Sequence, residues 1–275
     1  MKYKLVADSS CNIFELDVDY KSVPLKILTD HKEYVDNNKL NVHDMLNDFK
    51  EYKGKSGTSC PSTGEWLEAF GDADIVFGVT ITSGLSGSFN AAMMAKRQYE
   101  EMYPERRVYI VDSLSAGPEI TLIVNKLAGL IKEEKGYTEI RNSIIDYTRK
   151  THLMFSLSSL QNFARNGRIS PALAKSANVF GIRVVGKASY EGKLEPSGFC
   201  RGQKKAIKRL TQEMKDVGYK GGKVIIAHTE NLEAATSLAN LLKETYYNVD
   251  IKIMENAGLC SYYAETGGIL VGFEA

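Results

Sequence analysis

One segment of the sequence combines hydroxyl groups and glycines in a way that suits the binding of an anion. Residues 80–89 read TITSGLSGSF and join a continuous apolar run, 74–81, to a stretch with helical periodicity, 88–102. The first N–H groups of a helix are unpaired and lie at the positive end of its dipole, so a carboxylate or phosphate is stabilised there. Glycines let the backbone approach such a ligand, and serine hydroxyls add donors. The simpler interpretation is that Ser86 or Ser88 only caps the helix.

A second hydroxyl-rich turn precedes another expected helix. Residues 57–64 read GTSCPSTG, and Pro61 disfavours helical backbone at the residue before it. Ser62 or Thr63 would cap a helix that carries residues 65–70. Thr58 and Ser59 would then face the same anion as the first segment, unless the turn is a plain capped loop.

Ser86 also has to be considered as a nucleophile, because it lies between a strand and a helix. The G-x-S-x-G spacing of a nucleophile elbow fails, since position 88 is serine. A serine hydrolase or acyltransferase would need a histidine base, and none can be tied to Ser86 from the sequence. The chain has four histidines, His31, His43, His152 and His228.

The densest group of positive charges follows residue 200, with Arg201, Lys204 and Lys205 and then Lys208 and Arg209. Such a run is usually a solvated helix face, and the more specific interpretation is that it docks an acidic partner or a phosphate. The formal net charge of the whole chain is only +1, which argues against a nucleic-acid-binding protein.

The overall composition is typical of a globular protein that stays in the cytoplasm. No stretch approaches the roughly 20 apolar residues that a membrane helix needs. Asp8 interrupts the N-terminus too early for a signal peptide, so the chain is expected to begin with a strand. The four cysteines are scattered without a C-x-x-C pair, which favours free thiols in a reducing compartment over disulfides or a metal site.

Apolar runs alternate with amphipathic stretches, a pattern typical of an α/β protein with parallel strands. We expect two domains, 1–150 and 151–275, because the alternation restarts near Thr151. The expected strands cover residues 4–7, 22–28, 74–81, 107–111, 182–185, 223–227 and 250–254. The expected helices cover residues 42–52, 65–70, 88–102, 119–134, 203–217 and 232–246, and a hairpin turn is expected at 190–193.

Seven segments, in order along nearly the whole chain, give it a clear resemblance to the DegV family. They are VADSS at 6–10, VPL at 23–25, TSCPS at 58–62, SGLSGSF at 83–89, VDS at 111–113, RNGRI at 165–169, and Arg201 before the KKA of 204–206. The resemblance implies two α/β domains, with a mainly parallel sheet in the first and an apolar tunnel that ends at the domain cleft. Members of this family bind fatty acids and are not themselves enzymes.

The resemblance also implies the ligand and its contacts. Thr58 and Ser86 match the family's carboxylate ligands, with Ser59 and Ser88 as their neighbours. The expected ligand is a long-chain fatty acid of the palmitate, stearate or oleate type, with no other cofactor. Each buried methylene contributes about 0.8 kcal/mol, so such an acid can bind tightly without a cationic partner for its head group.

The chain departs from the family pattern at two positions. Members commonly carry a histidine near the C-terminus that meets the carboxylate, and Tyr263, or less favourably Tyr262, stands in its place. A tyrosine donates a hydrogen bond but carries no positive charge at neutral pH. Cys60 replaces the glutamine of the family's Thr-Ser-Gln-Pro-Ser motif.

A protein partner is implied as well. In bacteria that have fatty acid kinase, DegV proteins serve as its acyl-carrying subunit, so a separate ATP-dependent kinase is the expected partner and Arg201, Lys204 and Lys205 are the candidate docking residues. A carrier that has lost kinase coupling, or one for another amphipathic ligand, remains an alternative. A hydrolase or acyltransferase using Ser86 and a sugar-phosphate or nucleotide binder with a polar cleft are the competing functions.

Overall fold

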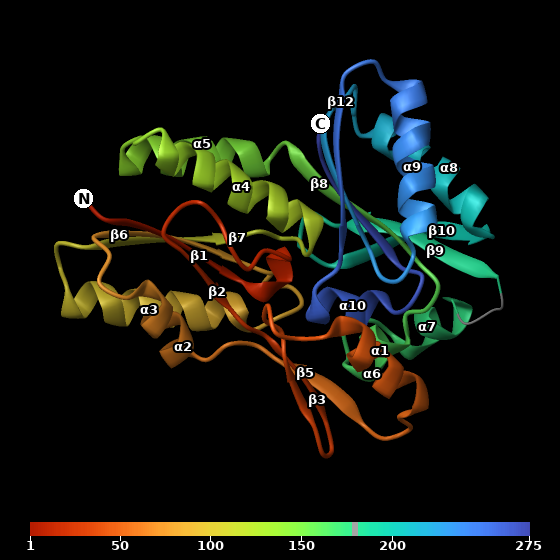
Figure 1. The fold of residues 1–275 in the computed structure, drawn as a ribbon, viewed down its shortest axis with the longest axis horizontal. Coiled ribbons are helices and arrows are strands. Elements are labelled where there is room, and N and C mark those ends of the chain that lie inside the picture. Colours follow the sequence, from red (N-terminus) through yellow and green to blue (C-terminus); the bar gives the residue numbers. More distant parts are fainter. Residues whose placement is uncertain (178–180) are drawn as a thin grey trace.

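The computed structural model describes residues 1–177 and 181–275 as three sheets surrounded by helices (Figure 1). The elements before residue 150 are β1 (Tyr3–Asp8), the short 3-10 helix η1 (Ser9–Cys11), β2 (Tyr20–Val23), β3 (Lys26–Thr29), β4 (Glu33–Val35), α1 (Val42–Glu51), β5 (Ser56–Ser59), α2 (Thr63–Phe70), β6 (Ile75–Thr80), α3 (Ser88–Met102), β7 (Arg107–Asp112), α4 (Pro118–Lys132) and α5 (Tyr137–Thr148). Those after it are β8 (Thr151–Leu157), α6 (Gln161–Arg165), α7 (Pro171–Ala177), β9 (Ile182–Ala188), β10 (Leu194–Arg201), α8 (Gln203–Asp216), β11 (Gly222–His228), α9 (Leu232–Thr245), β12 (Val249–Glu255), α10 (Gly258–Ala264) and β13 (Ile269–Glu274).

The first sheet is parallel throughout and has the strand order β2-β1-β6-β7. All six residues of β6 are buried, as expected for a central strand covered on both faces. Helices α2 and α3 cover one face, and α4 and α5 cover the other (Figure 1). The predicted parallel α/β arrangement is therefore confirmed for this part of the chain.

The strand predicted for residues 22–28 is wrong as a single element. It is divided between β2, at the edge of the parallel sheet, and β3, which pairs with β4 and β5 in a separate antiparallel sheet. Pro24 has no N–H to donate, and the N–H of Leu25 donates to the Ser9 hydroxyl at 3.0 Å instead of to a neighbouring strand. The chain changes direction at this interruption.

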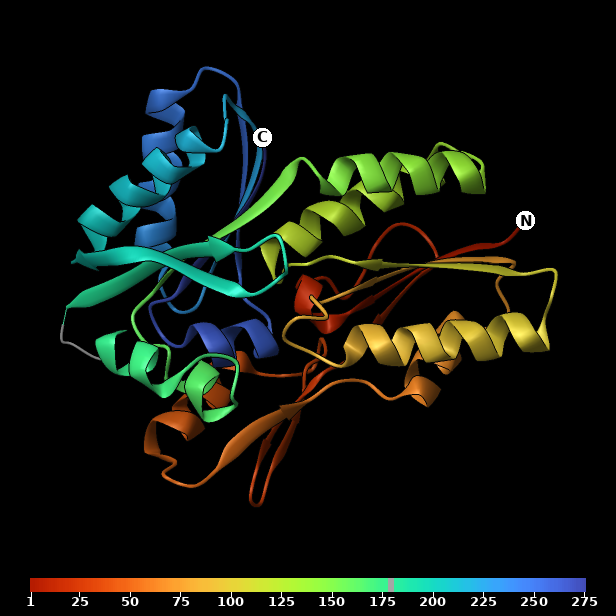
Figure 2. The ribbon, with the colours of Figure 1, turned by 180° about the vertical axis from the view of Figure 1, so that it is seen from behind.

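The second sheet has six strands in the order β10-β9-β8-β13-β11-β12 and is largely antiparallel. Only β11 and β12 pair in parallel. The hairpin turn expected at 190–193 is confirmed by the antiparallel pair β9 and β10, whereas the parallel pattern expected from the alternation is wrong for the other three pairs. Helices α8 and α9 cover one face, as Figure 2 shows from behind. The strands of the parallel sheet end at Asp112 and those of this sheet begin at Thr151.

Helix α4 contacts both large sheets. It packs on β1 and β6 of the first sheet and on β8, β11 and β13 of the second. Gly272 of β13 permits this contact, because a Cβ there would lie 2.5 Å from the backbone nitrogen of Glu119. Among the described residues, no helix is long and apolar enough to cross a membrane.

Candidate functional site

An apolar cavity of about 270 Å³ lies where the carboxyl ends of the parallel strands meet the second sheet. Ligands of open α/β sheets bind in this position, where backbone N–H groups and loops converge. The loops after β6 and β7 supply Ile81, Leu85 and Ala116. Strand β8 supplies Leu153, Phe155 and Leu157, which alternate along the strand and therefore share one face.

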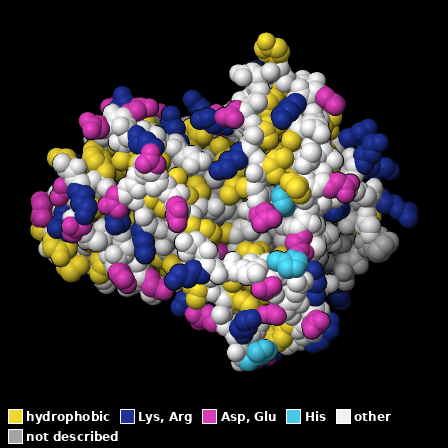
Figure 3. All heavy atoms as spheres, in the orientation of Figure 1, with side chains coloured by type: hydrophobic (Ala, Val, Ile, Leu, Met, Phe, Trp, Pro, Cys, Tyr) yellow, Lys and Arg dark blue, Asp and Glu magenta, His cyan; other side chains and the backbone are white. Residues whose placement is uncertain are grey.

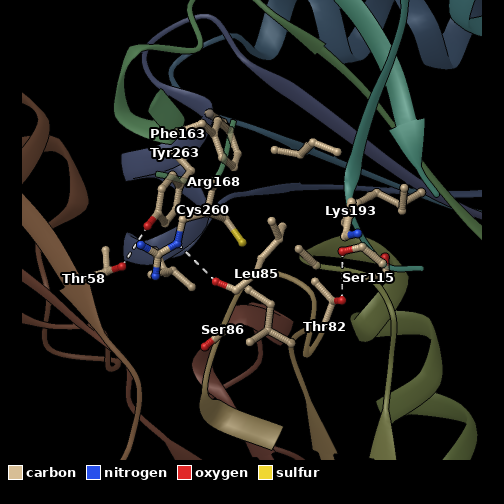
Figure 4. Close-up of a pocket in the computed structure, with 18 of the residues that line it drawn as sticks. Thr58, Thr82, Leu85, Ser86, Ser115, Phe163, Arg168, Lys193, Cys260 and Tyr263 are labelled. Atoms are coloured by element: carbon tan, nitrogen blue, oxygen red, sulfur yellow. Dashed lines mark hydrogen bonds between the residues drawn. The ribbon is translucent and has the colours of Figure 1, made fainter. Parts of the chain in front are cut away.

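Thr58, Tyr263 and Arg168 lie at one end of this cavity in Figure 4, and Thr82 and Ser115 lie at the other. The hydroxyls of Thr58, on β5, and Tyr263, on α10, lie 2.8 Å apart. Each carries one proton and only one of them lies between the two oxygens, so the other is available to a ligand. Ser59 also lines the cavity, directly after Thr58.

The neighbouring residues on the same two elements form a second hydroxyl pair. Ser56 lies two residues before Thr58 on β5, and its hydroxyl is 2.7 Å from that of Tyr262. The Tyr262 hydroxyl also accepts a hydrogen bond of 3.0 Å from the Asn166 amide. Tyr262 is 1% exposed and does not line the cavity, so the tyrosine that faces the ligand site is Tyr263.

Burial raises the pKa of Tyr263 above its ordinary value, and the phenol therefore stays neutral. Its helix, α10, begins with two N–H groups that donate to the buried carboxyl of Asp36, Gly258 at 2.7 Å and Leu259 at 3.1 Å. Burial also raises the pKa of Asp36, to about 6. Asp36 thus fixes the position of the helix that carries Tyr263.

Ser86 and Ser88 have different environments, although both were expected near the ligand. Ser86 lines the cavity, and its oxygen accepts the Ser88 N–H at 3.2 Å. Among the described residues none accepts the Ser86 hydroxyl proton, which leaves this donor for a ligand. Ser88 is fully buried and does not line the cavity, because its hydroxyl donates to Asp8 at 2.7 Å. The structure thus places Ser88 outside the cavity lining, behind Ser86, and its proximity to a ligand stays a prediction.

Arg168 lines the same polar end and was not recognised as a site residue in the sequence. Its Nε donates to the carbonyl of Leu85 at 3.2 Å, and its Nη1 donates to the carbonyl of Asn166. Gly167, with φ of +70°, turns the chain after α6 and directs the following residue back toward the cavity. The predicted donor set was uncharged, and the structure adds a guanidinium to it.

The opposite end of the cavity is closed by the β9–β10 hairpin, which contributes Gly192 and Lys193 (Figure 4). The Thr82 hydroxyl donates to the carbonyl of Gly192 at 2.9 Å, and this hydrogen bond is buried. Gly84 allows the close approach, since a Cβ on it would lie 2.9 Å from the carbonyl of Glu191. The hairpin of the second sheet and the loop after β6 are thereby joined across the cavity.

The four histidines lie elsewhere. His43 is exposed and its Nδ1 lies 2.6 Å from Glu230, while His228 is buried and accepts the N–H of Asn231 at 3.4 Å. Neither these two nor His31 and His152 line the cavity with Ser86. No group of three or more potential metal ligands occurs among the described residues.

The candidate docking residues lie apart from the cavity lining. Arg201, Lys204 and Lys205 are exposed at the start of α8, where Figure 3 shows Lys and Arg side chains together at the edge of the molecule. Arg209 differs from them, because its Nε donates to Glu213 at 2.7 Å. The basic cluster is therefore smaller than the sequence suggested.

The chain is similar to known proteins in sequence and in structure. A family model described as "Uncharacterised protein, DegV family" matches residues 2–274. A DegV domain-containing protein of Streptococcus gordonii is 38% identical over 279 residues, which cover 100% of this chain and 99% of the relative.

Two solved structures are similar over nearly their whole length. A DegV family protein from Eubacterium eligens, loaded with heptadecanoic acid, is 46% identical, with a TM-score of 0.96 and 99% of each chain covered. The Streptococcus pneumoniae Fatty Acid Kinase (Fak) B3 protein, loaded with linoleic acid, is 38% identical, with a TM-score of 0.97 and coverage of 100% of this chain and 99% of that one.

Proposed function

This chain belongs to the DegV family, and from that premise we propose that it binds a long-chain fatty acid and presents the carboxylate to a partner. The observation that carries the proposal is the composition of the cavity, which is apolar along β8 and has free hydrogen-bond donors at one end. Each methylene removed from water contributes about 0.8 kcal/mol, so the hydrocarbon provides most of the affinity. The donors fix which end of the ligand faces the loops.

The carboxylate is held by three kinds of donor in this proposal. The Ser86 hydroxyl and the free proton of the Thr58–Tyr263 pair provide two neutral hydrogen bonds. Arg168 provides a positive charge, and hydrogen bonds between charged partners are stronger than neutral ones. Tyr263 supplies the hydrogen bond of the family's histidine without its charge, and Arg168 supplies a charge nearby. Ser59 lies beside the site as a neighbour of Thr58.

The protein acts as a carrier and not as a catalyst in this proposal. Acyl phosphate would form with phosphate from a separate ATP-dependent kinase, as the name of the pneumococcal Fak B3 protein suggests for that relative. The exposed residues Arg201, Lys204 and Lys205 form the proposed docking surface for such a kinase. We also propose a division into domains 1–150 and 151–275 and a cytoplasmic location, which the four free cysteines support.

The docking surface is tested with the variant Arg201→Ala/Lys205→Ala. We expect it to bind the fatty acid normally, and the cognate kinase should phosphorylate the bound fatty acid more slowly. Lys215→Ala, which is exposed near the other end of α8, is the matched control and should behave as the wild type. A normal rate of acyl phosphate formation with the double variant would remove the docking residues from the proposal.

The competing functions receive less support from the site. A serine hydrolase needs a base within hydrogen-bond reach of Ser86, and no histidine lines its cavity. A sugar phosphate or nucleotide is polar and would make few favourable contacts with Leu153, Phe155 and Leu157 of β8, which line the cavity.

Native mass spectrometry of the purified protein, followed by organic extraction, tests the binding of lipid directly. A fatty acid bound in a one-to-one ratio is the expected result. Failure both to carry a lipid and to take up added palmitate or oleate would contradict the proposal.

A further inference from the structure

A second cavity adjoins the one described above. It has a volume of about 510 Å³ and is lined by parts of β7, α5, β8 and the β9–β10 hairpin. Leu153 and Ala188 line both cavities. Met154 pairs with Lys187 on adjacent antiparallel strands, and Leu153 precedes Met154 while Ala188 follows Lys187, so Leu153 and Ala188 lie opposite each other. Their side chains form one side of the partition between the two cavities.

A hydrogen-bonded group forms the other side of this partition. Ser115 lines the first cavity, and its hydroxyl donates at 2.5 Å to Glu119, which lines the second. Thr151 donates to the other carboxyl oxygen of Glu119 at 2.8 Å. Both oxygens of this buried carboxyl therefore have partners, and hydrocarbon passing beside it would leave no polar group unsatisfied.

The partition lies at the end of the first cavity that is remote from the carboxylate donors. In Figure 4, Ser115 is at the opposite end from Thr58 and Tyr263. A fatty acid bound with its carboxylate at those hydroxyls would direct its methyl end toward Ser115 and Ala188. The first cavity alone is smaller than the roughly 300–1,000 Å³ of ordinary ligand sites.

We propose that the tail of a long acyl chain passes between Ala188 and Ser115 into the second cavity, and that the small side chain of Ala188 sets the longest chain that binds well. This inference rests on the proposed fatty-acid binding and adds the determinant of chain length. Apolar residues are available to receive the tail on the far side, since Val111, Ile144 and Ile145 line the second cavity and Val111 and Ile144 share one apolar cluster. A larger residue at position 188 would project into the passage.

The test compares the variants Ala188→Val and Ala188→Phe with the wild type, using saturated acids from dodecanoic to octadecanoic. Octadecanoic acid should bind at least roughly tenfold more weakly to Ala188→Phe, because several methylenes lose their site. Ala188→Val should show a smaller loss. Dodecanoic acid should bind all three proteins equally, which also shows that the variants are folded.

A measurement without mutation follows the tail directly. An octadecanoic acid with a nitroxide near its methyl end should broaden the methyl NMR signals of Ile144 and Ile145, and one with the nitroxide near the carboxylate should not. Unchanged chain preference in both variants, or unaffected Ile144 and Ile145 signals, would overturn the inference and leave the proposed function intact. If the wild type binds no acid of any length, the proposed function itself fails.

Discussion

The hydroxyl oxygens of Thr58 and Tyr263 lie 2.8 Å apart, although 205 residues separate them in the chain. One belongs to an edge strand of the small antiparallel sheet and the other to a short helix near the C-terminus. Their contact closes the polar end of the cavity with side chains from both ends of the sequence. The proposed carboxylate site therefore exists only in the completely folded chain.

Removing the Tyr263 hydroxyl should weaken fatty-acid binding without abolishing it. Tyr263→Phe keeps the ring and loses one hydrogen bond worth about 0.5–1.5 kcal/mol, so the Kd should rise roughly two- to tenfold. Titration with a fluorescent fatty acid measures this change. Tyr262→Phe is the matched control, since its hydroxyl bonds to Ser56 and Asn166 outside the cavity. Its Kd should be unchanged, and equal effects of the two substitutions would contradict the proposed role of Tyr263.

Replacing Arg168 should reveal how much the ligand's charge contributes. A hydrogen bond to a charged group is worth about 1.5–3 kcal/mol, so Arg168→Gln should raise the Kd for a fatty acid by roughly ten- to a hundredfold. The Kd for the corresponding fatty alcohol should change little, because the alcohol carries no charge. Arg165→Gln, an exposed position on α6, serves as control. A loss of equal size for acid and alcohol would show that Arg168 acts only through packing.

Bound lipid should protect Cys60 from alkylation. Cys60 lines the cavity and is only half-buried, whereas Cys11, Cys200 and Cys260 are buried. Iodoacetamide should therefore modify Cys60 first in delipidated protein, and a saturating fatty acid should slow that reaction severalfold. Peptide mass spectrometry identifies the site, and the variant Cys60→Ser should show no early modification. Equal rates with and without lipid would place the ligand away from Cys60.

Ser86 should not react with a fluorophosphonate probe. Such a probe labels serines that are activated by an adjacent base, and no histidine lines the cavity that contains Ser86. A serine hydrolase labelled in the same reaction confirms that the probe is active. Labelling that disappears in Ser86→Ala would instead support the hydrolase function.

The buried carboxyl of Glu119 should make the free energy of unfolding depend on pH. Burial raises its pKa from 4.5 to about 7, so the folded state binds this proton more tightly than the unfolded state. The stabilisation from this group is then complete below pH 4.5 and is lost as the pH rises to about 7, by an amount on the order of 3 kcal/mol. Urea unfolding between these pH values measures it.

Glu119→Gln should remove that part of the pH dependence, since the amide does not titrate. Glu133→Gln, at an exposed position, should leave it unchanged. Identical pH profiles for the wild type and Glu119→Gln would mean that Glu119 does not titrate in this range.

Local patterns in the sequence were sufficient to predict most elements of the parallel sheet. The helix expected at 88–102 has those bounds in α3, and Ser62 caps α2 with a complete capping box to Glu65. Helix periodicity and helix capping depend on residues that are close in the sequence, so the sequence alone predicts them. The interruption at Pro24 and the antiparallel pairing of β8 with β13 depend on which distant segments meet, and periodicity contains no information about that.

The residues of the candidate site also fall into those that the sequence predicts and those that only the folded structure reveals. Thr58, Ser59 and Ser86 could be identified because hydroxyl groups cluster in short motifs. Arg168 was visible only as part of a motif, because its proximity to the hydroxyls depends on the turn after α6 and on the carbonyl of Leu85 from a distant loop. Ser88 was expected beside the ligand because the sequence does not show that its hydroxyl donates a hydrogen bond to Asp8.

The buried hydrogen bond from Thr82 to the carbonyl of Gly192 has a consequence for the rate at which ligand is exchanged. The hairpin and the loop that it joins belong to different sheets, so a ligand behind this contact can leave there only after the two separate. The lifetime of the complex would then be governed by how often this contact opens, and two lipids of different affinity could have similar residence times. A carrier of this kind would retain its cargo during diffusion until the contact opens.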